Sequence, residues 1–412
     1  MLSDVGTGAL YLHIPFCARK CAYCDFSSWA TRVGDPLMAA YARSLEAQIG
    51  EAESLGLLGG CVTAYVGGGT PTLLGDEGLG SLVSAVRSVA PKIQELTCEA
   101  NPDSLSDEVL HAVREAGATR LSIGVQSLVD AELAELGRLH DSVCARERVS
   151  AAVASGLDVS VDLMCATPLQ TDEGWAHTLK GAINLGVGHV SVYPLQIEEG
   201  TALDARYATE PCDWNDEGVQ ASRMTQARAF LEGFGLRRYE VASYAVAGKE
   251  CRHNIAYWTG VPYIGLGTGA SSMLDLKGYL RLRRGCPRLP EPPSHAARVR
   301  LTIRTGRREL AENPRLSTLS FSLEFLSEAQ ALAEDLMLGA RLVDGLRPEL
   351  VLRARELFGT KFDDTIDDLL AQELLAEKDG RLAPTERGWL LGNELYGALW
   401  DLAPGEVVVA SC

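Results

Sequence analysis

Three similar stretches of sequence decide the fold: AGATRLSIG at residues 116–124, SGLDVSVDL at residues 155–163 and LGVGHVSVY at residues 185–193. In each stretch a glycine precedes a short apolar run, namely Gly117, Gly156 and Gly186. A glycine in this place fits the left-handed position that ends a helix, and the run after it is typical of a buried strand. The sequence therefore predicts a unit of helix and strand that repeats along the chain.

The repeat extends from these stretches toward the amino terminus. Helical patterns separate six β-rich runs, which are Ala9–Ile14, Cys61–Val66, Ile93–Glu99, Arg120–Gly124, Leu157–Met164 and His189–Leu195. Repeated βα units build a parallel sheet, so the fold class is α/β. Six units are too few for a closed eight-stranded barrel, and they suit an open, partial (β/α)6 barrel or a doubly wound sheet. Either fold places its chemistry at the carboxyl ends of the strands.

The character of the sequence changes after about residue 275. We expect a core domain over residues 1–275, a linker or excursion over 276–328 and a helical domain over 329–412. The middle segment contains RLRRGCPRLPEPPSH, rich in proline and arginine. The last segment shows helices near 350–358 and 362–372, followed by a short strand pair and another helix in LLAEKDGRLAPTERGWLL. This order resembles a winged helix, but the acidic chain has no basic recognition helix.

Composition and charge exclude several classes of protein. The net charge of −17 argues against non-specific binding to nucleic acid, which requires neutralised phosphates. No apolar run reaches the ~18 residues of a membrane-spanning helix, and the first residues lack the pattern of a signal peptide. We therefore expect a cytoplasmic protein. In that reducing compartment the eleven cysteines should include metal ligands rather than disulfides, and those outside the motif below should be small buried hydrophobes.

The stretch FCARKCAYCDF, residues 16–26, follows the first strand and spaces Cys17, Cys21 and Cys24 as CxxxCxxC. Thiolates are soft ligands that suit iron–sulfur clusters. Three cysteines on a four-iron cluster leave one iron open, which can bind a small molecule such as S-adenosylmethionine (SAM). The alternative is a zinc site, but structural zinc needs a fourth ligand nearby, and only His13 is a candidate.

Polar residues and glycines mark the ends of the other strands. Gly67, Gly68 and Gly69 in YVGGGTPTLL let a ligand approach the backbone closely. Glu99, Gln126 and Asp162 end later strands, and Arg138 follows in LGRLHD. Each alone could be a turn, a cap or a salt bridge. Because polar groups are costly to bury without partners, their recurrence at consecutive strand ends favours one shared ligand.

Six motifs together resemble the HemN/HemW branch of radical-SAM proteins: YLHIPFCARKCAYCDF, YVGGGTPTLL, EANPDSL, RLSIGVQS, LGRLH and HNIAYW. The resemblance covers residues 9–275 and implies a partial (β/α)6 TIM-like radical-SAM barrel with a small, mostly helical C-terminal domain. It implies a [4Fe-4S] cluster on Cys17, Cys21 and Cys24. It further implies that SAM contacts Tyr11, Gly68, Gly69, Thr70, Glu99, Gln126, Arg138 and Asp162.

Two groups of this branch differ at the cysteine motif. The oxygen-independent coproporphyrinogen III oxidases of porphyrin biosynthesis carry a fourth cysteine, CxxxCxxCxC, where this chain has Phe26. They also carry a longer segment before the motif. Both departures favour the heme-chaperone group, with the oxidase as the alternative. That resemblance implies heme as cargo, acceptor proteins that include membrane respiratory enzymes, a homodimer and no oxidase activity.

The stretch HNIAYW, residues 253–258, is shared with the heme-chaperone group. By analogy His253 is the candidate heme ligand, with Cys251 nearby as another. The alternative is a structural turn that keeps His253 in a hydrogen-bond network. The chain departs from the family pattern at Ala166 and Thr167, where glycine and leucine are usual, and over Lys277–Ser327.

Overall fold

A computed structural model describes residues 8–209, 212–405 and 407–412. Its main feature is a large sheet whose central strands correspond to the six β-rich runs of the sequence. These are β1 (Ala9–Ile14), β4 (Thr63–Gly68), β5 (Glu95–Ala100), β6 (Arg120–Gln126), β7 (Asp158–Cys165) and β8 (His189–Pro194). They lie side by side in chain order, and each pairs with the next in parallel. The parallel sheet predicted from the βα repeat is confirmed.

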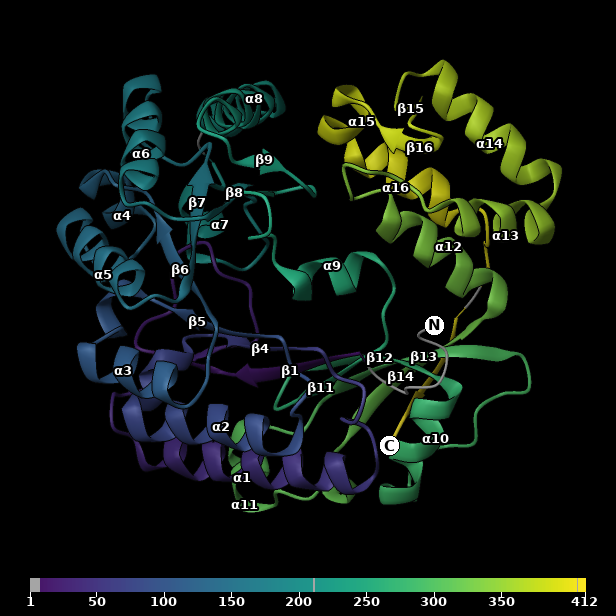
Figure 1. Ribbon diagram of the computed structural model, residues 1–412, viewed down its shortest axis with the longest axis horizontal. Helices are drawn as coiled ribbons and strands as arrows, with labels where there is room; N and C mark the ends of the chain where they lie inside the picture. Colours follow the sequence, from purple (N-terminus) through teal and green to yellow (C-terminus); the bar gives the residue numbers. More distant parts are fainter. Residues whose placement is uncertain (1–7, 210–211, 406) are drawn as a thin grey trace.

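The helices between these strands cover one face of the sheet. They are α1 (Pro36–Ser54), α2 (Gly75–Val89), α3 (Asp107–Glu115), α4 (Asp130–Glu135), α5 (Ser142–Ala154) and α6 (Asp172–Asn184). Figure 1 shows them along the outside of a curved sheet. A doubly wound sheet would require the strand order to reverse, whereas here the order is sequential from β1 to β8. The architecture is therefore the open, barrel-type alternative.

Backbone conformation at the helix ends matches the glycine pattern of the sequence. Gly117, Gly156 and Gly186 have φ of 104°, 85° and 75°. Each ends the helix before a strand, so these three positions are left-handed as predicted. The amino-terminal ends of helices also follow known rules, as α1 shows. It begins after Asp35, whose side chain accepts a hydrogen bond from the Leu37 amide, and a proline lies in its first turn.

The sheet continues at both edges beyond the parallel strands. Next to β1 lies β11 (Tyr263–Leu266), which is parallel to it, followed by antiparallel β12 (Ser271–Asp275), β13 (Ala296–Ile303), β14 (Phe321–Ser327) and β17 (Val408–Ser411). Next to β8 lie β10 (Ser243–Ala245) and β9 (Arg237–Arg238). The segment 276–328, interpreted from its prolines as a linker or excursion, thus contains α10 (Leu276–Gly285), β13, α11 (Arg307–Glu312) and β14.

The last part of the chain forms a second hydrophobic core built on residues such as Leu336, Leu350, Phe362 and Leu395. Its elements are α12 (Glu328–Gly339), α13 (Pro348–Phe358), α14 (Thr360–Ala371), β15 (Leu375–Lys378), β16 (Arg381–Pro384), α15 (Glu386–Leu390) and α16 (Gly392–Trp400). The predicted order of helices, short strand pair and helix is confirmed. Figure 1 shows this yellow-green group beside the barrel.

In the described part of the chain, three α-helices lie between β8 and β11. They are α7 (Ala202–Tyr207), α8 (Glu217–Gly233) and α9 (Arg252–Trp258), and the last of these carries the HNIAYW stretch. Figure 1 shows α9 on the inner side of the curved sheet, opposite the outer helices. Within the described part of the chain, no helix combines the length and the apolar character needed to cross a membrane.

Candidate functional site

The three motif cysteines come from one loop. Cys17 ends β2 (Phe16–Cys17), which pairs in parallel with β3 (Trp29–Ala30), and Cys21 and Cys24 lie in the turn between the two strands. All three side chains are partly exposed, and they line one cavity of about 130 Å³. Burial raises the pKa of the Cys17 and Cys24 thiols above the usual value. We call this space the cysteine cavity.

The cysteine cavity gathers most of the residues that the sequence placed in the site. Ten of the twelve candidates line it: Cys17, Cys21, Cys24, Gly68, Gly69, Thr70, Glu99, Gln126, Arg138 and Asp162. The three cysteines follow β1, and the other residues come from the carboxyl-terminal halves of β4 to β7 and from the loops that follow these strands. Parallel strands that lie in sequence order bring these ends to one edge of the sheet, which is why residues far apart in the chain meet here.

The spacing of the three cysteine side chains bears on the kind of metal group that they could hold. Among the described residues, no three histidine, cysteine or acidic side chains converge closely enough to share one metal ion. In a four-iron cluster each cysteine binds a different iron. The three thiols therefore surround the space that the cluster would fill and do not converge on a single metal ion. His13, the candidate for a fourth zinc ligand, has its Nε2 2.9 Å from the Ser27 carbonyl oxygen and its Nδ1 3.0 Å from the Tyr11 hydroxyl. The donor set fits an iron–sulfur cluster better than zinc.

Two carboxylates, Glu99 and Asp162, line the cysteine cavity. Glu99 accepts hydrogen bonds from the Gly68 amide and from the Tyr65 hydroxyl, both at 2.9 Å. Burial raises its pKa to about 7. Asp162 accepts a 3.2 Å bond from the Ser122 hydroxyl, and burial raises its pKa as well. These oxygens can accept hydrogen bonds from the amino group or hydroxyls of a ligand.

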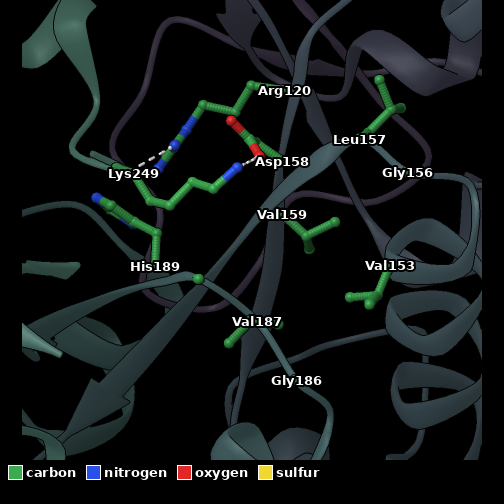
Figure 2. A pocket seen from close by; sticks show the side chains of 11 residues that line it. Arg120, Val153, Gly156, Leu157, Asp158, Val159, Gly186, Val187, His189 and Lys249 are labelled. Atoms are coloured by element: carbon green, nitrogen blue, oxygen red, sulfur yellow. Dashed lines mark hydrogen bonds and ion pairs between the residues drawn. The ribbon is translucent and has the colours of Figure 1, made fainter. Parts of the chain in front are cut away.

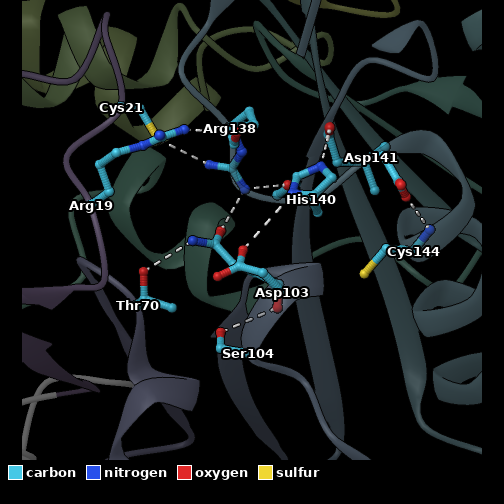
Figure 3. A network of polar contacts seen from close by, with 12 residues as sticks. Arg19, Cys21, Thr70, Asp103, Ser104, Arg138, His140, Asp141 and Cys144 are labelled. Atoms are coloured by element: carbon cyan, nitrogen blue, oxygen red, sulfur yellow. Dashed lines mark hydrogen bonds and ion pairs between the residues drawn. The ribbon is translucent and has the colours of Figure 1, made fainter. Parts of the chain in front are cut away.

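Arg138 links the cysteine loop to the strand ends, as Figure 3 shows. Its Nη1 donates to Cys21 Sγ at 3.4 Å, and its Nη2 donates to Asn101 Oδ1 at 2.8 Å and to the Gly124 carbonyl at 2.7 Å. Asn101 in turn donates to Thr70 Oγ1 at 3.0 Å. Sequence reasoning missed Asn101, although it stands two residues after Glu99 at the same strand end. The arginine therefore places positive charge beside a cysteine sulfur.

Tyr11 lies outside the cysteine cavity and lines a neighbouring one of about 360 Å³. We call this second space the tyrosine cavity. Its walls are Tyr11, His13, Phe26, Ser27, Gly68, Glu99, Tyr257, Tyr263, Gly269 and Ser271. Phe26, Gly68 and Glu99 line both cavities, so the two spaces share a wall. The sequence associated Tyr257 with His253 but missed Tyr263, because only the packing of α9 against β4 and of β11 against β1 brings the two tyrosines together.

His253 lies in neither cavity. Its side chain is buried with 1% exposed, and burial lowers its pKa to about 3. Its Nδ1 is 3.0 Å from Thr63 Oγ1 and its Nε2 is 3.0 Å from the Tyr257 hydroxyl. Both ring nitrogens thus have protein partners. Cys251 is also buried, with its thiol 3.5 Å from Glu95 Oε1.

Another cavity, of about 260 Å³, lies at the opposite, amino-terminal ends of β6, β7 and β8 (Figure 2). Two contacts connect its charged residues. Lys249 forms an ion pair with Asp158, and Arg120 donates to the Lys249 carbonyl oxygen at 2.9 Å. In βα barrels this end contributes to stability rather than to chemistry, and we attribute a structural role to it.

The other cysteines were expected to be buried. This holds for Cys61, Cys98, Cys165, Cys251 and Cys286. It is wrong for Cys144, Cys212 and Cys412, which are partly exposed. Composition alone cannot place a cysteine within an element, and these three lie in the first turn of α5, in a loop and at the chain end.

Two family models and a solved structure are similar to this chain. The radical SAM superfamily model matches residues 11–182, and the HemN C-terminal domain model matches residues 326–391. The coproporphyrinogen III oxidase HemN of Escherichia coli has a similar fold, with a TM-score of 0.76 at 20% identity over 97% of this chain and 91% of that chain. The open βα sheet, with its cysteine motif at the strand ends, thus defines a radical-SAM protein.

Relatives with similar sequences show to which family of radical-SAM proteins the chain belongs. The heme chaperone HemW of Mycobacterium tuberculosis is 34% identical over 395 residues, which is 95% of this chain and 94% of the relative. HemW of Bacillus subtilis is 30% identical over 94% of this chain and 98% of its own length. A mitochondrial radical SAM domain-containing protein 1 of Bos taurus is 34% identical over 89% of this chain and 81% of its own. The chain belongs to the heme chaperone HemW family.

Proposed function

We propose that this chain carries one [4Fe-4S] cluster on Cys17, Cys21 and Cys24, with SAM at the iron that no cysteine binds. The observation that carries the proposal is the cysteine cavity, where three thiols and the polar strand ends line one space. When bound, such a cluster supplies single electrons for SAM chemistry. The protein holds and orients both groups.

The residues of the cavity suit these two tasks. The Arg138 guanidinium donates to Cys21 Sγ and places a positive charge beside this sulfur. Glu99 and Asp162 offer carboxylate oxygens to the amino and hydroxyl groups of SAM. Gly68, Gly69 and Thr70 present backbone to the ligand, and Gln126 adds an amide. Tyr11 would reach SAM only across the wall that the two cavities share.

We further propose that the chain binds heme and transfers it to acceptor proteins, membrane respiratory enzymes among them, and that it acts as a homodimer. The support is similarity to relatives named heme chaperone HemW over almost the full length of the chain. The tyrosine cavity provides an aromatic space beside the proposed SAM site. Light scattering of the purified protein checks the dimer.

The cluster assignment predicts the behaviour of a cysteine variant. Cys21→Ser should lose the visible absorbance of the reconstituted cluster and most of its iron, because serine oxygen is a poor ligand for this cluster. Iron and sulfide analysis after anaerobic reconstitution measures the change. Cys144→Ser, a partly exposed cysteine outside the cavity, is the matched control and should keep a full cluster. Four irons per chain in Cys21→Ser would contradict the assignment.

Heme handling is tested by titrating heme into the anaerobic, cluster-loaded protein. We expect a shifted Soret band, followed by transfer of the heme to an added apo-acceptor. Turnover of coproporphyrinogen III with SAM and a reductant is measured in parallel. Decarboxylated product without stable heme binding would support the oxidase instead. No heme binding at micromolar concentration would reject the chaperone function.

A further inference from the structure

The tyrosine cavity contains two tyrosines that are each paired with a histidine. The Tyr11 hydroxyl is 3.0 Å from His13 Nδ1, and the Tyr257 hydroxyl is 3.0 Å from His253 Nε2. His253 is itself anchored by Thr63 Oγ1 at 3.0 Å from Nδ1. A phenol that is hydrogen-bonded to a buried neutral imidazole has its oxygen held in one position. Such a pair can present a phenol oxygen to a metal ion.

Phe26 gives a second indication of the ligand. Its side chain is 63% exposed, although it lines both cavities. A large exposed aromatic ring at the mouth of a cavity suits an apolar partner that would cover it. A flat aromatic macrocycle could pack against this ring while its centre faces the tyrosines. The cavity chemistry thus fits a metalloporphyrin with an oxygen donor.

The position of His253 argues against direct iron binding by its imidazole. Both nitrogens have hydrogen-bond partners and the ring does not line the cavity, whereas Tyr257 does. To ligate iron, His253 would have to break one of these bonds and displace Tyr257. Tyr257 needs only to exchange its proton for the metal. Tyrosine oxygen is a known axial ligand of heme iron.

We propose that Tyr257 supplies the iron ligand for ferric heme in the tyrosine cavity, with His253 as the positioning residue that holds the Tyr257 hydroxyl by a hydrogen bond. On binding, the O–H bond of Tyr257 breaks, an Oη–Fe(III) bond forms and the proton is released to the solvent. The iron stays ferric and no electron is transferred. The inference rests on the proposed heme binding and names the ligand for it.

The other tyrosines of the cavity are less suited. Tyr11 is already proposed to contact SAM. Tyr263 packs with its ring centroid 4.5 Å from that of Tyr257. In the described part of the chain, no histidine forms a hydrogen bond with Tyr263. It therefore provides a matched control, since it lines the same cavity without a hydrogen-bonded histidine.

The test titrates ferric heme and iron-free protoporphyrin IX separately into cluster-loaded wild type, Tyr257→Phe and Tyr263→Phe. Wild type should show the phenolate-to-iron charge-transfer band and iron–phenolate vibrations by resonance Raman. Tyr257→Phe should lose both and bind ferric heme at least about tenfold more weakly, since even a hydrogen-bond partner of a metal ligand contributes that much. Its affinity for protoporphyrin IX should stay within about twofold of wild type. Tyr263→Phe should keep the phenolate signature.

Further outcomes decide between the alternatives. If Tyr257→Phe keeps the phenolate signature, or loses affinity for both porphyrins equally, Tyr257 is not the ligand. An imidazole-type spectrum that disappears in His253→Ala would assign His253. Should Tyr257→Phe fail to fold or to hold its cluster, Tyr257→His should replace the phenolate spectrum with an imidazole one. Wild type that binds neither porphyrin would overturn the proposed heme function itself.

Discussion

Glu99 stands where the cysteine and tyrosine cavities meet, and its buried carboxyl couples the site to pH. Its pKa in the folded protein is about 7, against 4.5 for an unperturbed glutamate. Between these values the folded chain holds a proton that the unfolded chain releases. The free energy of unfolding should therefore fall as pH rises through this window.

A Glu99→Gln variant isolates that contribution. The unfolding free energy of the variant, relative to wild type, should rise by about 2 kcal/mol between pH 5 and pH 8, because glutamine cannot lose a proton. Denaturant unfolding across this range measures the difference. Glu115→Gln, which removes an exposed carboxylate from α3, controls for net charge and should show a flat difference. Parallel curves for Glu99→Gln and wild type would contradict the assignment.

The backbone conformation of Ala166 explains why glycine is usual at this position in the family. It has φ of 54°, a left-handed conformation that costs an alanine about 1–2 kcal/mol and costs glycine nothing. Ala166→Gly removes this strain, but it also loses a buried methyl group and increases the conformational entropy that the chain loses on folding. Because these effects oppose one another, the free energy of unfolding should change by less than about 0.5 kcal/mol. Ala182→Gly, equally buried but within α6, should cost about 1–2 kcal/mol. Thermal melts of both variants compare them, and equal losses would exclude the strain.

At the scale of elements, the start of α12 is defined by a capping box. The Ser327 hydroxyl accepts a hydrogen bond from the Gln330 amide, and the Gln330 side chain accepts one from the Ser327 amide at 3.0 Å. This box ends β14 and begins the first helix of the second core. The entry into the C-terminal helices is therefore set by local bonds.

Removal of the cap should destabilise this helix measurably. Ser327→Ala should lower the unfolding free energy by about 1 kcal/mol, because it leaves the Gln330 amide without its partner. Ser327→Asp, which can still cap, should lose less than about 0.5 kcal/mol. Denaturant unfolding followed by circular dichroism gives both values. An alanine variant as stable as wild type would show that the box contributes nothing.

At the scale of the whole molecule, a group of buried charges joins the sheet to the C-terminal helices. Glu334 on α12 accepts from Arg298 at 2.7 Å and from Arg300 at 2.9 Å, both on β13. Its side chain is 6% exposed, and Asp335 adds a second bond to Arg298 at 2.7 Å. Trp389 of α15 also reaches the barrel and donates to the Val241 carbonyl oxygen at 2.8 Å.

Loss of Glu334 should loosen this junction. Glu334→Ala should cost about 1.5–3 kcal/mol, because Arg298 and Arg300 each lose one carboxylate partner while Arg298 keeps Asp335 and Arg300 keeps Glu324. Glu328→Ala, on the same helix as Glu334, removes an exposed ion pair with Arg353 of α13 and should cost less than about 1 kcal/mol. Unfolding free energies and limited proteolysis of the C-terminal region compare the two variants. Similar costs for both would show that burial of the network does not matter.

Local patterns in the sequence determined the parallel βα sheet, the cysteine loop and the polar strand ends. Each of these depends on short-range rules: glycine ends a helix, apolar runs form buried strands, and sequential parallel strands bring their carboxyl ends together. Ten candidate residues met in one cavity for this reason. The motif of Cys17, Cys21 and Cys24 required no tertiary information.

Only the tertiary structure decided the rest. The strands β12, β13, β14 and β17 form by pairing with partners that are distant in the chain. The prolines and arginines between β12 and β13 favoured a linker, so the sequence did not predict this pairing. The inward packing of α9 turned His253 into the barrel wall and left Tyr257 facing a cavity with Tyr11 and Tyr263. The direction of a side chain within a motif depends on what its element packs against, and a spacing rule along the sequence does not contain that information.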